Sequence, residues 1–135
     1  MNEQSFTFPL LHNAIGIMTP FLLAATGGLF TELAGMLNIA LEGLMLIGAF
    51  FSVVFAGLTG SLVLGILLGV GSAVAAAAVF GAVSLNLKAN IFISGLATNL
   101  LASGLTVVLA YQLFGNKGVV RFEIPQLPSL TIPAL

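Results

Sequence analysis

The stretch ELAGMLNIALEGLMLIGAF, residues 32–50, sets the constraints for the whole chain. It holds two of the four acidic residues of the protein inside an otherwise apolar sequence. If the stretch is helical, steps of four, three and four residues create one small and polar face, made by Thr31, Gly35, Asn38 and Glu42. A carboxylate near the centre of a bilayer costs about 3 kcal/mol on insertion scales. We therefore expect Glu42 to face protein, water or a solute.

The composition indicates that lipid is the solvent for most of the surface. Only 5% of the 135 residues are charged, 59% are hydrophobic, and the mean hydropathy is +1.22. A soluble domain carries about 25% charged residues. This chain has too little charge to cover a water-exposed surface, so we expect an all-α, polytopic membrane protein.

The same composition excludes several kinds of chemistry. Because cysteine is absent, disulfides, thiolate metal sites and cysteine nucleophiles are excluded. One histidine and no aspartate leave no means of building a metal cluster or a Ser-His-Asp triad within the chain. The net charge of −1, without a basic run, gives no support to nucleic-acid binding. We expect neither a metal nor a cofactor.

Uncharged runs predict where the chain crosses the membrane. The first span is expected at 14–31, with Pro20 tolerated because neighbouring helices can satisfy the freed carbonyl. The nine uncharged residues between Glu32 and Glu42 reach about 14 Å as a helix, less than half of a bilayer core of about 30 Å. Segment 33–42 is therefore predicted to be a short re-entrant turn or the buried start of the next helix.

The next 45 residues carry no formal charge and would measure about 68 Å as one helix, more than twice the core thickness. They must hold two spans, which the turn signal GLTGS places at 43–56 and 62–83. The remaining elements are a fourth span at 91–114 and an extramembrane loop with three prolines at 115–135. Small residues let helices approach closely in lipid. We assign helix packing to five glycines: Gly35, Gly43, Gly65, Gly69 and Gly95.

Three blocks of sequence, in the same order, resemble the N-terminal half of the membrane permeases of bacterial ABC importers for nucleosides and simple sugars. These belong to the branched-chain amino acid/ribose-type permease group. The blocks are TPFLLAATGGLFTELAGMLNIALEGLMLIGAFF at 19–51, ISGLATNLLASGLT at 93–106 and IPQLPSLTIP at 124–133. The pattern N-I-x-L-E-G-x-M-x-x-G-A-F, at 38–50, is the most specific part. Many relatives have arginine at Leu33 and glycine at Ala40, and the first difference removes a cationic partner for Glu32.

The resemblance implies a multi-pass permease subunit in the bacterial inner membrane that forms a translocation path and is not itself an enzyme. It implies three partners: an ATP-binding subunit, an extracellular substrate-binding protein, and a second permease subunit or the missing C-terminal half. The permeases of this group are considerably longer, and the segment that docks their ATPase follows the loop at which this chain ends. We therefore expect the first half of such a permease, split or truncated.

A path for uncharged polar solutes needs hydrogen-bond donors and acceptors in an apolar channel. The candidate path residues are Asn38, Glu42, Ser94, Thr98 and Asn99. Each also has a purely structural interpretation: Glu42 can accept hydrogen bonds from a neighbouring helix, and the two amides can join helices within the bilayer. The sequence leaves both interpretations open.

Orientation and mechanism also have alternatives. The positive-inside rule sets Lys88 against Lys117 and Arg121 and favours a cytoplasmic tail. The resemblance implies the reverse, with Lys88 inside and both termini outside, and we adopt that orientation. A small oligomeric channel or secondary transporter would need inverted internal symmetry, which the sequence does not visibly show. A remnant that only inserts into the membrane is the third possibility.

Overall fold

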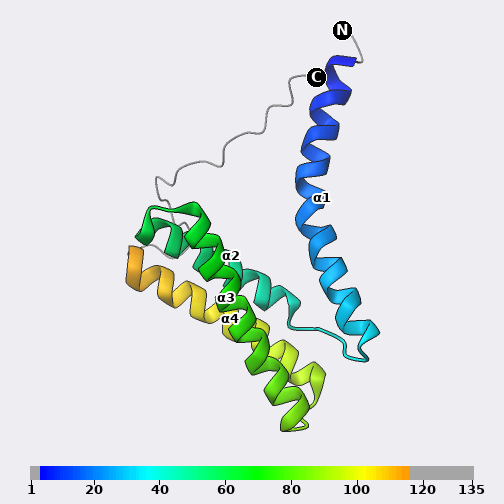
Figure 1. Cartoon of the computed structure of the whole chain (residues 1–135), viewed down its shortest axis with the longest axis vertical. Coiled ribbons are helices and arrows are strands. Elements are labelled where there is room, and N and C mark those ends of the chain that lie inside the picture. The colour runs from blue at the N-terminus through cyan, green and yellow to red at the C-terminus, as the bar shows by residue number, and fades with distance from the viewer. Residues whose placement is uncertain (1–3, 116–135) are drawn as a thin grey trace.

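The structure is a computed structural model that describes residues 4–115, and this part of the chain contains helices and turns but no strand. The elements are α1 (Gln4–Leu33), α2 (Leu41–Thr59), α3 (Leu62–Gly81), the π-helical turn η1 (Ala82–Asn86) and α4 (Ile91–Phe114), shown in Figure 1. The predicted proline-rich loop lies, from residue 116 onward, outside the described residues. So do Lys117 and Arg121, on which the orientation argument depends.

Four helical segments are long and apolar enough to cross a membrane, which confirms the predicted fold class. They cover Pro9–Leu33, Leu41–Thr59, Leu62–Asn86 and Ile91–Phe114. Large apolar side chains are exposed along all of them, as lipid-facing helices require. The first helix begins before the predicted start at residue 14. Its polar residues there do not end it, because a membrane helix can continue beyond the hydrocarbon core.

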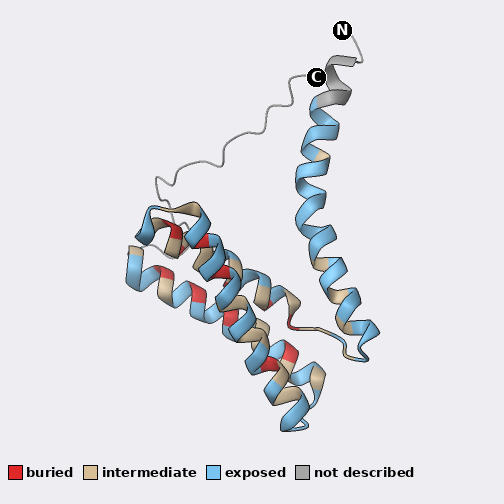
Figure 2. Cartoon of the chain, viewed as in Figure 1, coloured by how far each residue is buried: buried red, intermediate tan, exposed pale blue. Residues whose placement is uncertain are grey.

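Helices α2, α3 and α4 form a bundle, and α1 stands apart from it (Figure 1). Among the described elements, α1 contacts only α2, and the most apolar stretch of α1 buries no residue. Figure 2 shows the buried residues confined to the other three helices and the segment before α2. The core is therefore a three-helix core centred on α2, which packs against both α3 and α4.

Helix α1 ends in a Schellman motif. The amide of Gly35 donates to the Glu32 carbonyl at 2.9 Å, and the amide of Met36 donates to the Thr31 carbonyl at 2.9 Å. Gly35 has φ +82°, a left-handed conformation that glycine adopts without strain. The chain then continues without helix until Leu41. The expectation of one continuous helical face through Thr31, Gly35, Asn38 and Glu42 is therefore wrong, because the helix stops at Leu33.

Helices α2 and α3 pack through small residues. A Cβ added at Gly65 would lie 2.7 Å from the Ala56 Cα, and one at Gly69 would lie 2.8 Å from the Gly48 carbonyl oxygen. The next turn continues the antiparallel register, with Gly48 against Ala73. Side chains larger than hydrogen at 65 and 69 would separate the two backbones, so these glycines set the distance between the helices.

The connection from α3 to α4 is capped by side chains. Asn90 Oδ1 accepts hydrogen bonds from the amides of Phe92 at 2.9 Å and Ile93 at 3.4 Å, which satisfies two free donors at the start of α4. The hydroxyls of Ser84, in η1, and Ser94, in α4, lie 3.0 Å apart and are hydrogen-bonded. These bonds fix the short loop that carries Lys88.

Candidate functional site at the start of helix α2

The first turn of α2 is capped by a side chain from another helix. The cap position, Ala40, has no side chain that could accept a hydrogen bond. Instead, Asn99 of α4 lies across the helix end: its Oδ1 accepts from the Gly43 amide at 2.8 Å, and its Nδ2 donates to the Ile39 carbonyl at 3.0 Å. One amide side chain thus satisfies a donor in the first turn of α2 and an acceptor in the segment before it.

Two glycines make this contact possible. A Cβ at Gly43 would lie 2.8 Å from Asn99 Oδ1 and 3.0 Å from Asn99 Cα. A Cβ at Gly95 would lie 2.7 Å from the Cβ of Ile39. The backbone of α4 therefore crosses directly against the chain that enters α2, and Ala40 between them is completely buried.

The start of α2 lies against α4 some way along the length of α4. Asn99 is eight residues beyond Ile91, the first residue of α4, and eight residues of helix rise about 12 Å. A bilayer core is about 30 Å thick. If α4 begins at one interface, the start of α2 lies about 12 Å along α4 from that interface. Non-helical backbone at such depth is tolerated only where protein or a water-filled cavity surrounds it.

Glu42 stands in the first turn of α2 and is exposed. In the described part of the chain its carboxylate has no hydrogen-bond or ion-pair partner. A negative charge is favourable near a helix N-terminus because of the helix dipole. If this position lies within the hydrocarbon core, its exposed carboxylate requires cover from something outside these helices.

The other expected path residues have different surroundings. The Asn38 Oδ1 is buried without a hydrogen-bond partner in the described residues. Thr98 Oγ1 donates to the Ser94 carbonyl at 2.7 Å, within its own helix. The Ser94 hydroxyl is engaged by Ser84 and by the Asn90 carbonyl at 2.9 Å.

The structure therefore separates the five path candidates into two groups. Asn38 and Glu42 flank the start of α2 and keep unused polar atoms, whereas the polar groups of Ser94, Thr98 and Asn99 are engaged within the bundle. Four of the five packing glycines lie in close helix contacts. Gly35 does not: a Cβ there would meet nothing within 4 Å, and its role is to end α1.

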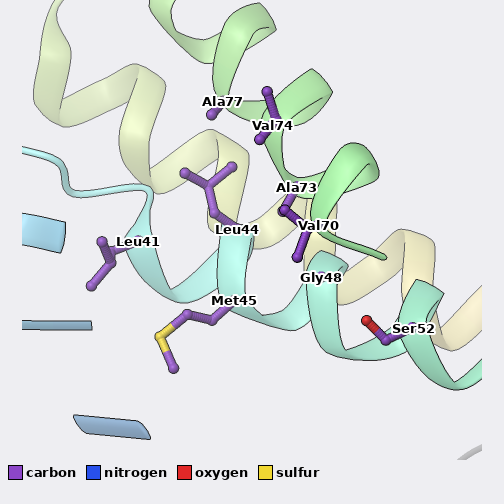
Figure 3. Close-up of a pocket in the computed structure, with 9 residues that line it drawn as sticks. All are labelled: Leu41, Leu44, Met45, Gly48, Ser52, Val70, Ala73, Val74 and Ala77. Carbon is purple, nitrogen blue, oxygen red and sulfur yellow. The ribbon is translucent and has the colours of Figure 1, made fainter. Parts of the chain in front are cut away.

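Several hollows flank α2, and the sequence alone indicated none of them. One is an open groove of about 370 Å³ between α2 and α3 (Figure 3). It is lined mainly by small and aliphatic side chains: Leu41, Leu44, Met45, Gly48, Ser52, Val70, Ala73, Val74 and Ala77. Another, of about 390 Å³, lies between α1 and α2. A smaller one, of about 200 Å³, lies between the non-helical segment before α2 and the C-terminal part of α3. It includes Phe80, the one aromatic residue of α3, which is the signal that sequence reasoning passed over.

The sequence also matches a known protein family. The family described as branched-chain amino acid transport system / permease component matches residues 10–128, nearly the whole chain. This chain belongs to that permease family. The resemblance drawn from the three sequence blocks is thereby confirmed, and the permease is an integral membrane protein.

Three curated relatives are similar to the permease. A putative glucose ABC transporter permease of Haloferax volcanii is 38% identical over 96% of this chain and 38% of its own length. A nucleoside ABC transporter permease of Lactococcus lactis is 35% identical over 100% of this chain and 44% of its own. A guanosine ABC transporter permease of Bacillus subtilis is 39% identical over 86% and 40%.

The permease thus spans about 40% of the length of these curated relatives. No solved structure matches it. The relatives divide between a sugar and nucleosides, so their names alone do not choose the solute of this chain.

Proposed function

We propose that this chain forms part of the transmembrane path of an ABC importer that carries a nucleoside or a simple sugar. In this role it catalyses no covalent step, and a separate ATP-binding subunit hydrolyses ATP. An extracellular substrate-binding protein delivers the solute, and a second permease subunit or the remaining permease half completes the path. The family membership and the three relatives support this proposal.

The observation that carries the proposal is the start of α2, which Asn99 of α4 caps. Asn99 holds the start of α2, and the first turn of α2 carries the exposed Glu42. This position therefore combines a carboxylate with backbone groups that need a partner from another helix, which the middle of a membrane helix does not. Intramembrane ionisable residues are functional candidates by default.

The energetic argument identifies what must cover Glu42. An unpaired carboxylate facing lipid at this depth costs about 3 kcal/mol. The Glu42 side chain is exposed, and no hydrogen bond or ion pair in the described part of the chain covers it. Either the completing permease subunit or a hydrated solute path must do so, and both belong to the proposed importer.

The proposal is tested by uptake in cells that contain this chain together with an ATP-binding subunit, a binding protein and the completing permease half. We expect ATP-dependent uptake of labelled nucleoside or glucose. Glu42→Gln should lower the uptake rate by about tenfold or more, since a hydrogen bond to a charged group contributes about 1.5–3 kcal/mol. Glu32→Gln, which removes an exposed carboxylate at the end of α1, is the matched control and should stay within about twofold. Equal uptake by the two variants would exclude a path role for Glu42.

A further inference from the structure

Helix α1 presents a side of small residues to an open hollow. Steps of four, four and three residues place Gly16, Pro20, Ala24 and Gly27 on the same side of α1, which we call its small face. Three of these residues, together with Leu23, line the hollow of about 390 Å³ between α1 and α2. In membrane proteins, small residues are enriched where helices approach one another closely. The small face therefore has the composition of a helix contact.

The small face makes no close helix contact within the described part of the chain. A Cβ added at Gly16 or at Gly27 would meet nothing within 4 Å. The far wall of the hollow is formed by Leu41 and Met45 of α2. Both side chains also line the groove between α2 and α3, and Figure 3 shows them at its edge, pointing away from α3. The hollow and the groove thus adjoin at the start of α2.

Pro20 leaves a backbone acceptor on the small face. Proline has no N–H, so it cannot donate to the carbonyl of Gly16, four residues earlier. A nearby hydroxyl can replace such a donor, but that of Thr19 donates to the Ile15 carbonyl at 2.7 Å. Gly16 lies within the apolar span Pro9–Leu33, and the core of a bilayer has no bulk water to satisfy it. A donor from a neighbouring helix is the usual solution.

The missing donor discriminates between possible occupants of the hollow. A lipid acyl chain has no donor for the Gly16 carbonyl. A second copy of α1 has no side-chain donor on its small face either, because that face consists of glycine, proline and alanine. A transmembrane helix with a hydroxyl or amide side chain can both approach closely and donate. The completing permease half is the source of such a helix that the relatives indicate, because the match covers only 38–44% of their length.

We propose that a transmembrane helix of the completing permease half docks against the small face of α1, in the hollow between α1 and α2. This inference rests on the proposed permease function and adds to it the surface on which the completing half is received. It also accounts for the separation of α1 from the other three helices, since the docked helix would lie between them.

The test is photo-crosslinking in the cells of the uptake assay, which contain the completing permease half. The photoreactive residue p-benzoylphenylalanine replaces either Leu23, which lines the hollow, or Leu22, which does not. Leu22 is the matched control, because it is also an exposed leucine and lies on the opposite side of α1 from Pro20. We expect an adduct with the completing half from position 23 and only lipid adducts from position 22.

Added bulk on the small face gives a second measurement. Gly27→Leu should lower the yield of the position-23 adduct about tenfold, the effect of overpacking a close helix contact. The melting temperature of the isolated chain should not fall, because a Cβ at this position meets nothing within 4 Å. Loss of the adduct without loss of stability would place the disturbed contact outside the described helices.

Three results would overturn the docking site: only lipid adducts from position 23, an adduct with a second copy of this chain, or equal yields of the completing-half adduct from both positions. Solute uptake by an assembly that gives any of these results would keep the proposed function and remove the docking site. An adduct between position 23 and the completing half, in an assembly that takes up no solute, would keep the docking site and remove the importer role.

Discussion

Replacing Asn99 with alanine tests whether the start of α2 depends on its contact with α4. The substitution removes two hydrogen bonds, to the Gly43 amide at 2.8 Å and to the Ile39 carbonyl at 3.0 Å. Interhelical hydrogen bonds in membrane proteins contribute about 0.6–1.7 kcal/mol each. We therefore expect a loss of about 1–3 kcal/mol, which corresponds to a melting temperature lower by roughly 5–10 °C.

The assay is thermal unfolding of the full chain in detergent, compared with Thr98→Ala. Thr98 is the neighbouring residue, and its hydroxyl bonds only to its own helix at Ser94. That control should change the melting temperature by no more than about 2 °C, as expected for a substitution worth about 0.5 kcal/mol or less. If the two variants unfolded at the same temperature, the reasoning about the cap would be refuted.

A double-mutant cycle sharpens the test. Gly43→Ala alone should destabilise the protein, because its Cβ would lie 2.8 Å from Asn99 Oδ1. With Asn99→Ala already present, the same change should cost less, since the obstructing oxygen is gone. We expect a coupling energy of about 0.5–2 kcal/mol between the two positions. Additive effects would show that the two residues do not meet in the folded protein.

Two further predictions concern glycines. Gly69→Ala should destabilise the α2–α3 contact by about 1–3 kcal/mol, because the added Cβ would meet α2 backbone at 2.8 Å, whereas Gly71→Ala, with nothing within 4 Å, should be neutral or slightly stabilising in the same unfolding assay. Gly35→Ala should cost about 1 kcal/mol because φ is +82°, and Gly27→Ala, inside α1 with open space, should cost nothing; equal melting temperatures for this second pair would show that Gly35 does not adopt the left-handed conformation.

The four spans could be predicted because they depend on run length and hydropathy, which are local properties of the sequence. The break after α1 was expected near its true place, but its cause was misassigned. Gly35 was interpreted as part of a packing face, yet the backbone turns left-handed there and ends the helix. A glycine in an apolar run is compatible with both roles, and periodicity alone does not distinguish them.

The roles of the polar residues could not be predicted in the same way. Asn99 bonds to groups 56 and 60 residues away, so its partners depend on the register between two helices. Ser94 and Thr98 lie beside it in sequence but satisfy their hydroxyls locally. Phe80 lines a hollow only because the fold brings the segment before α2 against α3. The sequence identified the polar residues within apolar segments, and the helix packing determined which of them lack a hydrogen-bond partner in the described part of the chain.

The capping of α2 by Asn99 of α4 also has a consequence for biosynthesis. Asn99 is translated 56 residues after Gly43, which takes about 3–11 s at about 5–20 residues per second. During that interval the nascent second helix enters the insertion machinery with its leading amide uncapped. Helix α4 must therefore be synthesised before α2 can reach its final position. Ribosome pausing between these two points would therefore prolong an immature state, and premature chain release there would yield a product prone to quality-control degradation.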